Sequence, residues 1–155
     1  MMHPAAVSFH VVGTPVPQGS SRAFLTRSRT GPPRAIITSA SKGLPLWRGL
    51  VSQAAMQVAP SPPWSGPIAL DVTFRLPQPK SRSRFRGRGK ERHEVPLYPD
   101  RRPDIDKLVR ALLDSMTGII FEDDAQVVRI AAVKEYGSPP GVSVTALRLP
   151  TEGVP

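Results

Sequence analysis

The most regular alternation of hydrophobic and polar positions lies in residues 68–76, IALDVTFRL, where every second side chain is apolar. A period of two is typical of a strand with one buried face, so this segment is predicted to be a half-buried β-strand. Shorter β-rich runs predict further strands at residues 7–12, 35–38, 127–136 and 142–149. The last two flank a Gly- and Pro-rich turn, GSPPG, which favours their pairing as a hairpin.

Two other segments repeat apolar residues with helical spacing. Residues 46–58 present one apolar face. Residues 104–117 place six apolar side chains in one stripe, namely Ile105, Leu108, Val109, Leu112, Leu113 and Met116. Gly118 is placed to end this helix. The order strand, helix, strand, long loop, helix, strand, strand predicts a single α+β domain over residues 1–155, in which a mixed β-sheet carries two main helices packed on one face.

The long loop spans residues 77–103 and is strongly basic. Its stretch KSRSRFRGRGKERHE carries seven bases and two acids. Arg occupies every second position from residue 82 to 88, but Gly87 and Gly89 argue against a regular edge strand. A loop of this length is either an ordered functional segment or a mobile, solvated one. In both cases it can bind the DNA backbone through counterion release.

The whole chain is basic, with 21 Lys and Arg against 12 Asp and Glu and a formal charge of +9. This balance suggests a polyanionic partner, although a solvated basic surface is the alternative that charge alone leaves open. The absence of Cys excludes disulfides, a thiolate metal site and a Cys nucleophile, and it fits a cytoplasmic protein. No apolar run approaches the roughly 20 residues of a membrane span, and the N-terminus lacks the pattern of a signal peptide, so no membrane association is expected.

Acidic residues gather at both ends of the second predicted helix. Asp104 follows Pro103 and is predicted at the N-cap, where its non-helical backbone would let its carboxylate converge with that of Asp106. The group Glu122, Asp123 and Asp124 follows the helix and could return beside its start if the chain folds back. Converging carboxylates repel, and a hard divalent cation offsets that repulsion. Mg²⁺, bound by one or two carboxylates, phosphate oxygens and water, would match a phosphodiester substrate.

Purely structural roles are open for the same residues. Asp104 could only cap the helix, and Asp106 could only favour its positive N-terminal dipole. Asp106, Arg110 and Asp114 are spaced four residues apart and could form an exposed ladder of ion pairs. The Glu-Asp-Asp segment could be a solvated turn.

The segment RPDIDKLVRALLDSMTGIIFEDDAQVVRIAAVKEYG resembles the signature of RusA-type Holliday junction resolvases, endodeoxyribonucleases common in phages and prophages. That pattern has Asp-x-Asp at a helix start, a helix ending near a Gly, an Asp-Asp-x-Gln and a strand with a Lys. Here it is formed by Asp104, Asp106, Gly118, the residues 123–126 and Lys134. The opening VVGTPVPQGSSR also resembles the family's N-terminal strand and Gly-x-Pro loop.

The resemblance implies a metal-dependent nuclease, usually a homodimer, with Asp104, Asp106 and Asp124 as catalytic metal ligands. It also implies a catalytic basic side chain one turn after Asp106, which here is Arg110. Lys107 departs from the family, which often has Asn at this position, and adds a charge that could touch the scissile phosphate. Mg²⁺ is the expected cofactor, with Mn²⁺ as an alternative. The expected location is the bacterial cytoplasm, with a host, phage or prophage as the source.

Eight basic residues are expected to bind DNA, namely Arg82, Arg84, Arg86, Arg88, Arg101, Arg102, Lys107 and Lys134. Together these expectations describe a Mg²⁺-dependent, structure-selective endonuclease that resolves four-way junctions by paired phosphodiester cleavage. Two cuts on opposing strands require two equivalent sites, which favours a twofold-symmetric dimer. The alternatives are a nuclease for other branched DNA and a basic DNA-binding protein without catalysis, whose acids are structural. A capsid or packaging accessory protein is supported only by the charge.

Overall fold

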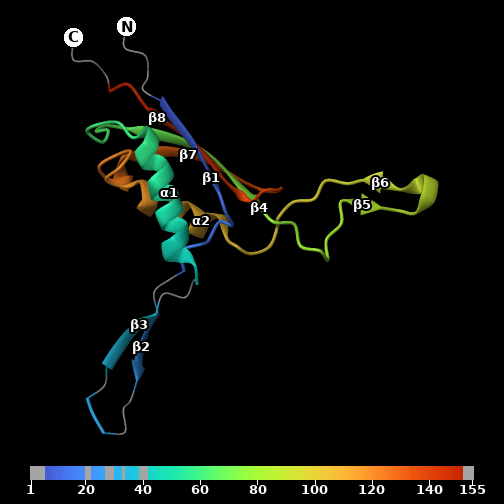
Figure 1. Cartoon of the computed structure of the whole chain (residues 1–155), viewed down its shortest axis with the longest axis horizontal. Helices are drawn as coiled ribbons and strands as arrows, with labels where there is room; N and C mark the ends of the chain where they lie inside the picture. Colours follow the sequence, from blue (N-terminus) through green and yellow to red (C-terminus); the bar gives the residue numbers. More distant parts are fainter. Residues whose placement is uncertain (1–5, 20–21, 27–29, 33, 39–41, 152–155) are drawn as a thin grey trace.

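A computed structural model describes residues 6–19, 22–26, 30–32, 34–38 and 42–151 (Figure 1). The described residues form a four-stranded sheet, two α-helices and two short two-stranded ribbons. The sheet has the order β1 (Ala6–Val12), β8 (Gly141–Arg148), β4 (Ile68–Leu76) and β7 (Val127–Tyr136). The helices are α1 (Leu44–Val58) and α2 (Ile105–Met116). The predicted α+β class with a mixed sheet is confirmed.

Strand β4 is the centre of the architecture. It pairs antiparallel with β8 on one edge and parallel with β7 on the other. The predicted hairpin between residues 127–136 and 142–149 is therefore wrong, because β4 lies between β7 and β8. The chain reaches β7 from β4 through α2, and a crossover of this kind brings the second strand back parallel to the first.

Both helices pack on one face of this sheet and form the core with it. The inward side chains of β4 are fully or almost fully buried, as its alternating pattern predicts. The apolar helix residues buried with them are Leu44, Trp47, Val51 and Ala55 of α1 and Leu108, Ala111, Leu112 and Met116 of α2. Burying one such Leu stabilises the fold by on the order of 2 kcal/mol, so the apolar stripe fixes how α2 lies on the sheet.

The segment after α2 is packed into the same core. Gly118, with a φ of 76°, turns the chain at the end of the helix. Ile120 and Phe121 are then fully buried, and the backbone amide of Trp64 donates to the carbonyl of Ile120. The following acidic segment is thus held at the C-terminal end of α2, next to the start of β7.

Two ribbons lie outside the sheet. The strand predicted at residues 35–38 is present as β3 (Arg34–Thr38), and it pairs with β2 (Arg22–Thr26), which the sequence pattern did not predict. The second ribbon consists of β5 (Phe85–Arg86) and β6 (His93–Glu94), joined through the 3-10 helix η1 (Gly89–Glu91).

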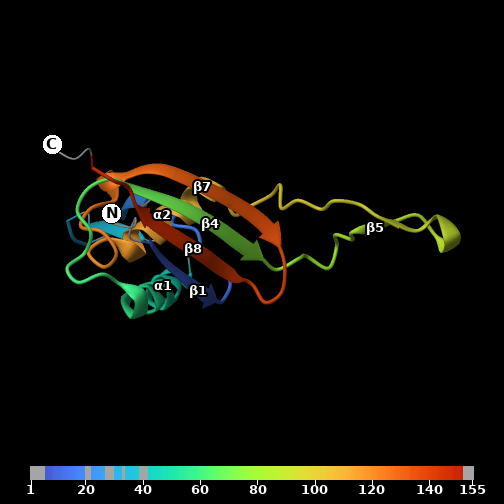
Figure 2. The same ribbon diagram turned by 90° about the horizontal axis from the view of Figure 1, so that it is seen from above.

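This second ribbon belongs to a long hairpin, residues 77–100, which projects from the end of the sheet and is called the arm below (Figure 2). Gly87 lies in the arm's turn with a φ of 80°, and a Cβ at that position would collide with the carbonyl oxygen of Glu91. The glycines that argue against a regular strand therefore allow the tight turn at the arm's tip.

Candidate functional site

Asp104 occupies the N-cap position of α2, as predicted, with an extended backbone (φ −71°, ψ 136°). Its side chain makes no capping hydrogen bond. Its Oδ2 instead accepts from Nζ of Lys107 at 2.8 Å. The Asp104 carboxylate is 44% exposed and therefore remains accessible. Asp106 is exposed in the first turn of the same helix, so two carboxylates stand at the start of α2.

The positive surroundings favour the charged form of Asp104. The hydrogen bond from Lys107 is the largest cause that lowers the pKa of Asp104 below its ordinary value, followed by the charge of the same ammonium. Arg102 and Lys134 add to this effect. The Asp104 carboxylate is therefore anionic throughout the neutral pH range.

The Asp-Asp-x-Gln motif forms a small turn, the 3-10 helix η2 (Asp124–Gln126). Oδ1 of Asp123 accepts from the amide of Ala125, and Oε1 of Gln126 accepts from the amide of Asp123, both at 2.8 Å. Nε2 of Gln126 also donates to the carbonyls of Trp64 and Gly66. Asp123 and Gln126 therefore build the turn, and the exposed Asp124 is held at its surface.

The two acidic motifs lie at opposite ends of α2. The twelve residues of this helix span about 18 Å, with Asp104 before its first turn and Asp124 beyond its last. Strand β7 gives the same separation. Asp124 lies just before the first residue of β7, whereas Asp104 lies near its last residues, because Lys134 donates a hydrogen bond to the carbonyl of Pro103. Among the described residues, no group of three or more His, Asp or Glu is placed to hold a metal ion. One chain therefore does not bring the three predicted ligands together.

The pair at the start of α2 nevertheless suits the expected cation. Mg²⁺ takes one or two protein carboxylates and completes its shell with water and phosphate oxygens. Asp104 and Asp106 offer two accessible carboxylates beside basic side chains, so the donor set fits a cation that also takes oxygens from a phosphodiester.

The ladder of ion pairs along α2, which the spacing of Asp106, Arg110 and Asp114 left open as an alternative, is not formed. In the described part of the chain, four ion pairs lie within 4.0 Å, and neither Arg110 nor Asp114 belongs to them. Arg110 is exposed one turn after Asp106. Its guanidinium is consequently available to a bound polyanion.

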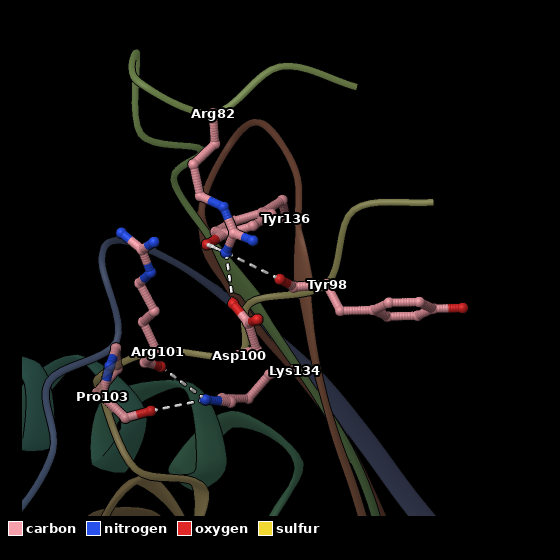
Figure 3. A network of polar contacts seen from close by, with 7 residues as sticks. All are labelled: Arg82, Tyr98, Asp100, Arg101, Pro103, Lys134 and Tyr136. Atoms are coloured by element: carbon pink, nitrogen blue, oxygen red, sulfur yellow. Dashed lines mark hydrogen bonds and ion pairs between the residues drawn. The ribbon is translucent and has the colours of Figure 1, made fainter. Parts of the chain in front are cut away.

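The base of the arm contains a polar network that the sequence pattern did not reveal (Figure 3). Nη1 of Arg82 donates to Oδ1 of Asp100 at 2.6 Å, to the carbonyl of Tyr98 at 3.1 Å and to the hydroxyl of Tyr136 at 3.3 Å. The hydrogen bond from Arg82, followed by its charge, holds the pKa of Asp100 below its ordinary value. Arg84 donates to the carbonyl of Tyr136 at 3.2 Å. Arg82 and Arg84, both predicted to bind DNA, thus fasten the arm to β7.

Four further basic residues of the arm, Arg86, Arg88, Lys90 and Arg92, lie nearer its tip and are exposed. Arg86 donates to the carbonyls of Ser83 and Phe85, and Arg92 stacks on the ring of Phe85 at 4.3 Å from its centroid. Arg88 and Lys90 are exposed at the turn. Residues 101–103 connect the arm to Asp104 at the start of α2 and are called the lead. Arg101 and Arg102 of the lead are exposed. Figure 3 shows Lys134, by contrast, turned towards the backbone of Arg101 and Pro103.

The family model of the endodeoxyribonuclease RusA matches residues 13–146, which include both acidic motifs, the arm and Lys134. The chain belongs to the RusA endodeoxyribonuclease family. The resemblance seen in the sequence is thereby confirmed, and membership of this family implies a Holliday junction resolvase endonuclease.

An uncharacterized protein of Bacillus subtilis (strain 168), YqaN, is 31% identical over 138 residues, which cover 89% of this chain and 93% of that protein. The similarity therefore extends over nearly the full length of both chains. No helix within the described ranges combines the length and apolar character that crossing a membrane requires.

Proposed function

We propose that this protein is a Mg²⁺-dependent, structure-selective DNA endonuclease that resolves four-way junctions by paired cleavage. The observation that carries the proposal is the accessible carboxylate pair of Asp104 and Asp106 at the start of α2, surrounded by Arg101, Arg102 and Lys107. A polyanion is attracted by the basic side chains, while the carboxylates provide oxygen ligands for a cation.

In this proposal Asp104 and Asp106 hold Mg²⁺, or Mn²⁺ in its place. When bound, the cation supplies Lewis-acid activation of the phosphodiester and of the attacking water. Arg110 lies one turn from Asp106, where its guanidinium can meet a non-bridging phosphate oxygen as charge develops. Lys107 and the two arginines of the lead position the flanking phosphates.

Asp124, the third predicted ligand, can join Asp104 and Asp106 in one site only if it comes from a second subunit. Within one chain the length of α2 alone separates it from Asp104 by roughly 18 Å. A homodimer that cuts both opposing strands has two equivalent sites related by a twofold axis. We propose that each site combines Asp104 and Asp106 of one subunit with Asp124 of the partner subunit.

Strand β7 is the surface best suited to this dimer. It is an edge strand of the four-stranded sheet, and the three large apolar side chains exposed on it are Val128, Ile130 and Val133. Such an edge can pair with another strand. Antiparallel pairing of two β7 edges places the start of one strand beside the end of the other, which brings the partner's Asp124 towards the end of β7 where Lys134 and Asp104 lie.

Incubation of a labelled synthetic four-way junction with the protein and Mg²⁺, beside a linear duplex and a three-way junction, tests the function. Paired cuts placed symmetrically in the four-way junction support the proposal. Equal cutting of the three-way junction favours a nuclease for branched DNA in general. Binding without any cutting favours a DNA-binding protein whose acids are structural.

Neutralising the tip of the arm is expected to weaken junction binding without slowing cleavage at saturating protein. Replacing Arg86, Arg88 and Lys90 by Gln should flatten the log–log salt dependence of the association constant by about 0.9 for each phosphate that the variant no longer neutralises. Fluorescence anisotropy over a series of salt concentrations measures this slope. The control is Arg48→Gln on α1, which should keep the wild-type slope. If the triple variant also keeps it, the arm's tip does not touch the DNA backbone.

Removing the ammonium of Lys107 is expected to strengthen cation binding in the absence of DNA. Nζ of Lys107 occupies the Asp104 carboxylate and must share it with a metal ion. An exposed ion pair is weak because solvent screens it, so Lys107→Ala should tighten binding of Mg²⁺ or Mn²⁺ by at most about fivefold. Isothermal titration calorimetry measures the affinity, with Lys90→Ala as the control. Weaker binding in Lys107→Ala would show that the lysine supports the site instead of competing for it.

A further inference from the structure

Lys134 is a charged residue of β7 on the face of the sheet that the helices cover. Its Cα pairs with that of Phe74 in β4, so its side chain belongs to the sheet face that carries the helices. Phe74 itself is fully buried in the core. A lysine on such a face can bury its aliphatic stem, provided that its ammonium finds polar partners.

The partners of this ammonium are backbone carbonyls. Nζ of Lys134 donates to the carbonyl of Arg101 at 3.0 Å and to that of Pro103 at 2.9 Å (Figure 3). Both carbonyls lie in the short lead between the arm and α2, before the first carbonyl of the helical ladder, which is that of Asp104 and accepts from Leu108. Two of the three ammonium donors therefore hold the residues that immediately precede Asp104.

The same end of β7 holds both legs of the arm. Tyr136, two residues further along the same face, receives hydrogen bonds from Arg82 and Arg84 of the outgoing leg. Arg82 in turn binds Asp100 of the returning leg. Lys134 then fixes the continuation of that leg up to Pro103. The arm, the lead and the start of α2 are thus fastened to one strand, which sets the position of Asp104 relative to the arm.

We infer that Lys134 is a positioning residue, which holds the Asp104 carboxylate in place by binding the backbone before it, and that it is not a DNA contact. The inference rests on the proposed function only in the claim that Asp104 acts in cleavage. The geometry favours this role over phosphate binding, because two donors of the ammonium are already directed at backbone carbonyls.

The first test is structural and needs neither DNA nor metal. Lys134→Met keeps the stem but removes the donors, Lys134→Arg keeps donors, and Lys42→Met is the matched control at an exposed lysine before α1. Hydrogen–deuterium exchange of amides in residues 101–108 is expected to be faster in Lys134→Met than in the other two variants. Equal exchange in all variants overturns the inference. If Lys134→Met does not fold, Lys134→Gln, whose side chain is too short to span both carbonyls, replaces it.

The second test separates positioning from DNA binding. In Lys134→Met the single-turnover cleavage rate at saturating protein is expected to fall about 10- to 100-fold, the range observed when groups that orient metal ligands are removed. The junction affinity and its salt slope should stay at wild-type values, and Lys134→Arg should recover part of the rate. A slope that flattens by about 0.9 with an unchanged saturating rate would identify Lys134 as a phosphate contact instead. If the wild-type protein cuts no junction, the proposed function fails, while the exchange experiment still decides the role of Lys134.

Discussion

Replacing Asp104 or Asp106 by Asn is expected to lower the single-turnover rate of junction cleavage by more than about 100-fold, while leaving junction binding intact. Loss of a group that merely orients a metal ligand costs about 10- to 100-fold, and loss of a ligand should cost more. Binding should survive because Asn is nearly the same size and the basic side chains of the arm and the lead are unchanged. Rapid-quench cleavage and anisotropy at matched salt measure the two quantities.

The structure supplies a matched control for this experiment on the same helix. Asp114 is also on α2 and belongs to none of the ion pairs within 4.0 Å in the described residues. Asp114→Asn changes the charge of α2 by the same amount, so it should cleave at the wild-type rate. If Asp104→Asn and Asp106→Asn also cleave at that rate, the carboxylate pair is structural and the DNA-binding alternative is favoured.

Mixed dimers of two inactive variants are expected to recover cleavage. A dimer of Asp104→Asn and Asp124→Asn subunits contains one site with both substitutions and one site with none, provided that Asp124 acts across the interface. Each homodimer has only damaged sites and should be inactive. The mixed dimer, isolated by co-expression with two different affinity tags, should therefore nick one strand of the junction, because it has a single intact site.

The opposite arrangement gives a different result. If Asp124 completed the site of its own chain, both sites of the mixed dimer would lack a ligand and no cleavage would return. A mixed dimer of Asp104→Asn with Asp106→Asn is the internal control, because every site in it carries a substitution under either arrangement. Recovery in that control, with both homodimers inactive, would show that Asp104 and Asp106 of one subunit do not belong to the same site. A wild-type protein that sediments as a monomer with full activity would exclude the shared site.

The arm and the start of α2 perform separable tasks in this scheme. The arm's tip carries exposed basic residues, and its base is bound to β7 through Arg82, Arg84 and Tyr136. The carboxylates lie where the returning leg of the arm enters α2. Binding and cleavage should respond to different substitutions, even though both depend on the end of one strand.

The sequence by itself determined the elements whose burial pattern is strong. Strand β4 has the predicted bounds, and α2 agrees within one residue at each end, because an alternating strand and a six-residue apolar stripe each fit only one kind of element. The N-cap position of Asp104 followed from Pro103 and the start of the stripe. The number of residues between the two acidic motifs also sufficed to indicate the family, because this spacing can be read along the chain without knowing which elements pack together.

Only the tertiary structure decided which elements are neighbours and which charged groups are used internally. A turn between residues 136 and 141 is compatible with a hairpin, but in the structure β4 lies between β7 and β8 and pairs with both, and no local signal records that strand order. The same crossover holds Asp124 at the far end of α2. Arg82, Arg84 and Lys134 are indistinguishable in sequence from the other basic residues, yet the structure directs them at Asp100, Tyr136 and the lead into α2. Those bonds join residues far apart in the chain, and such pairs become neighbours only when the sheet and its helices are packed together.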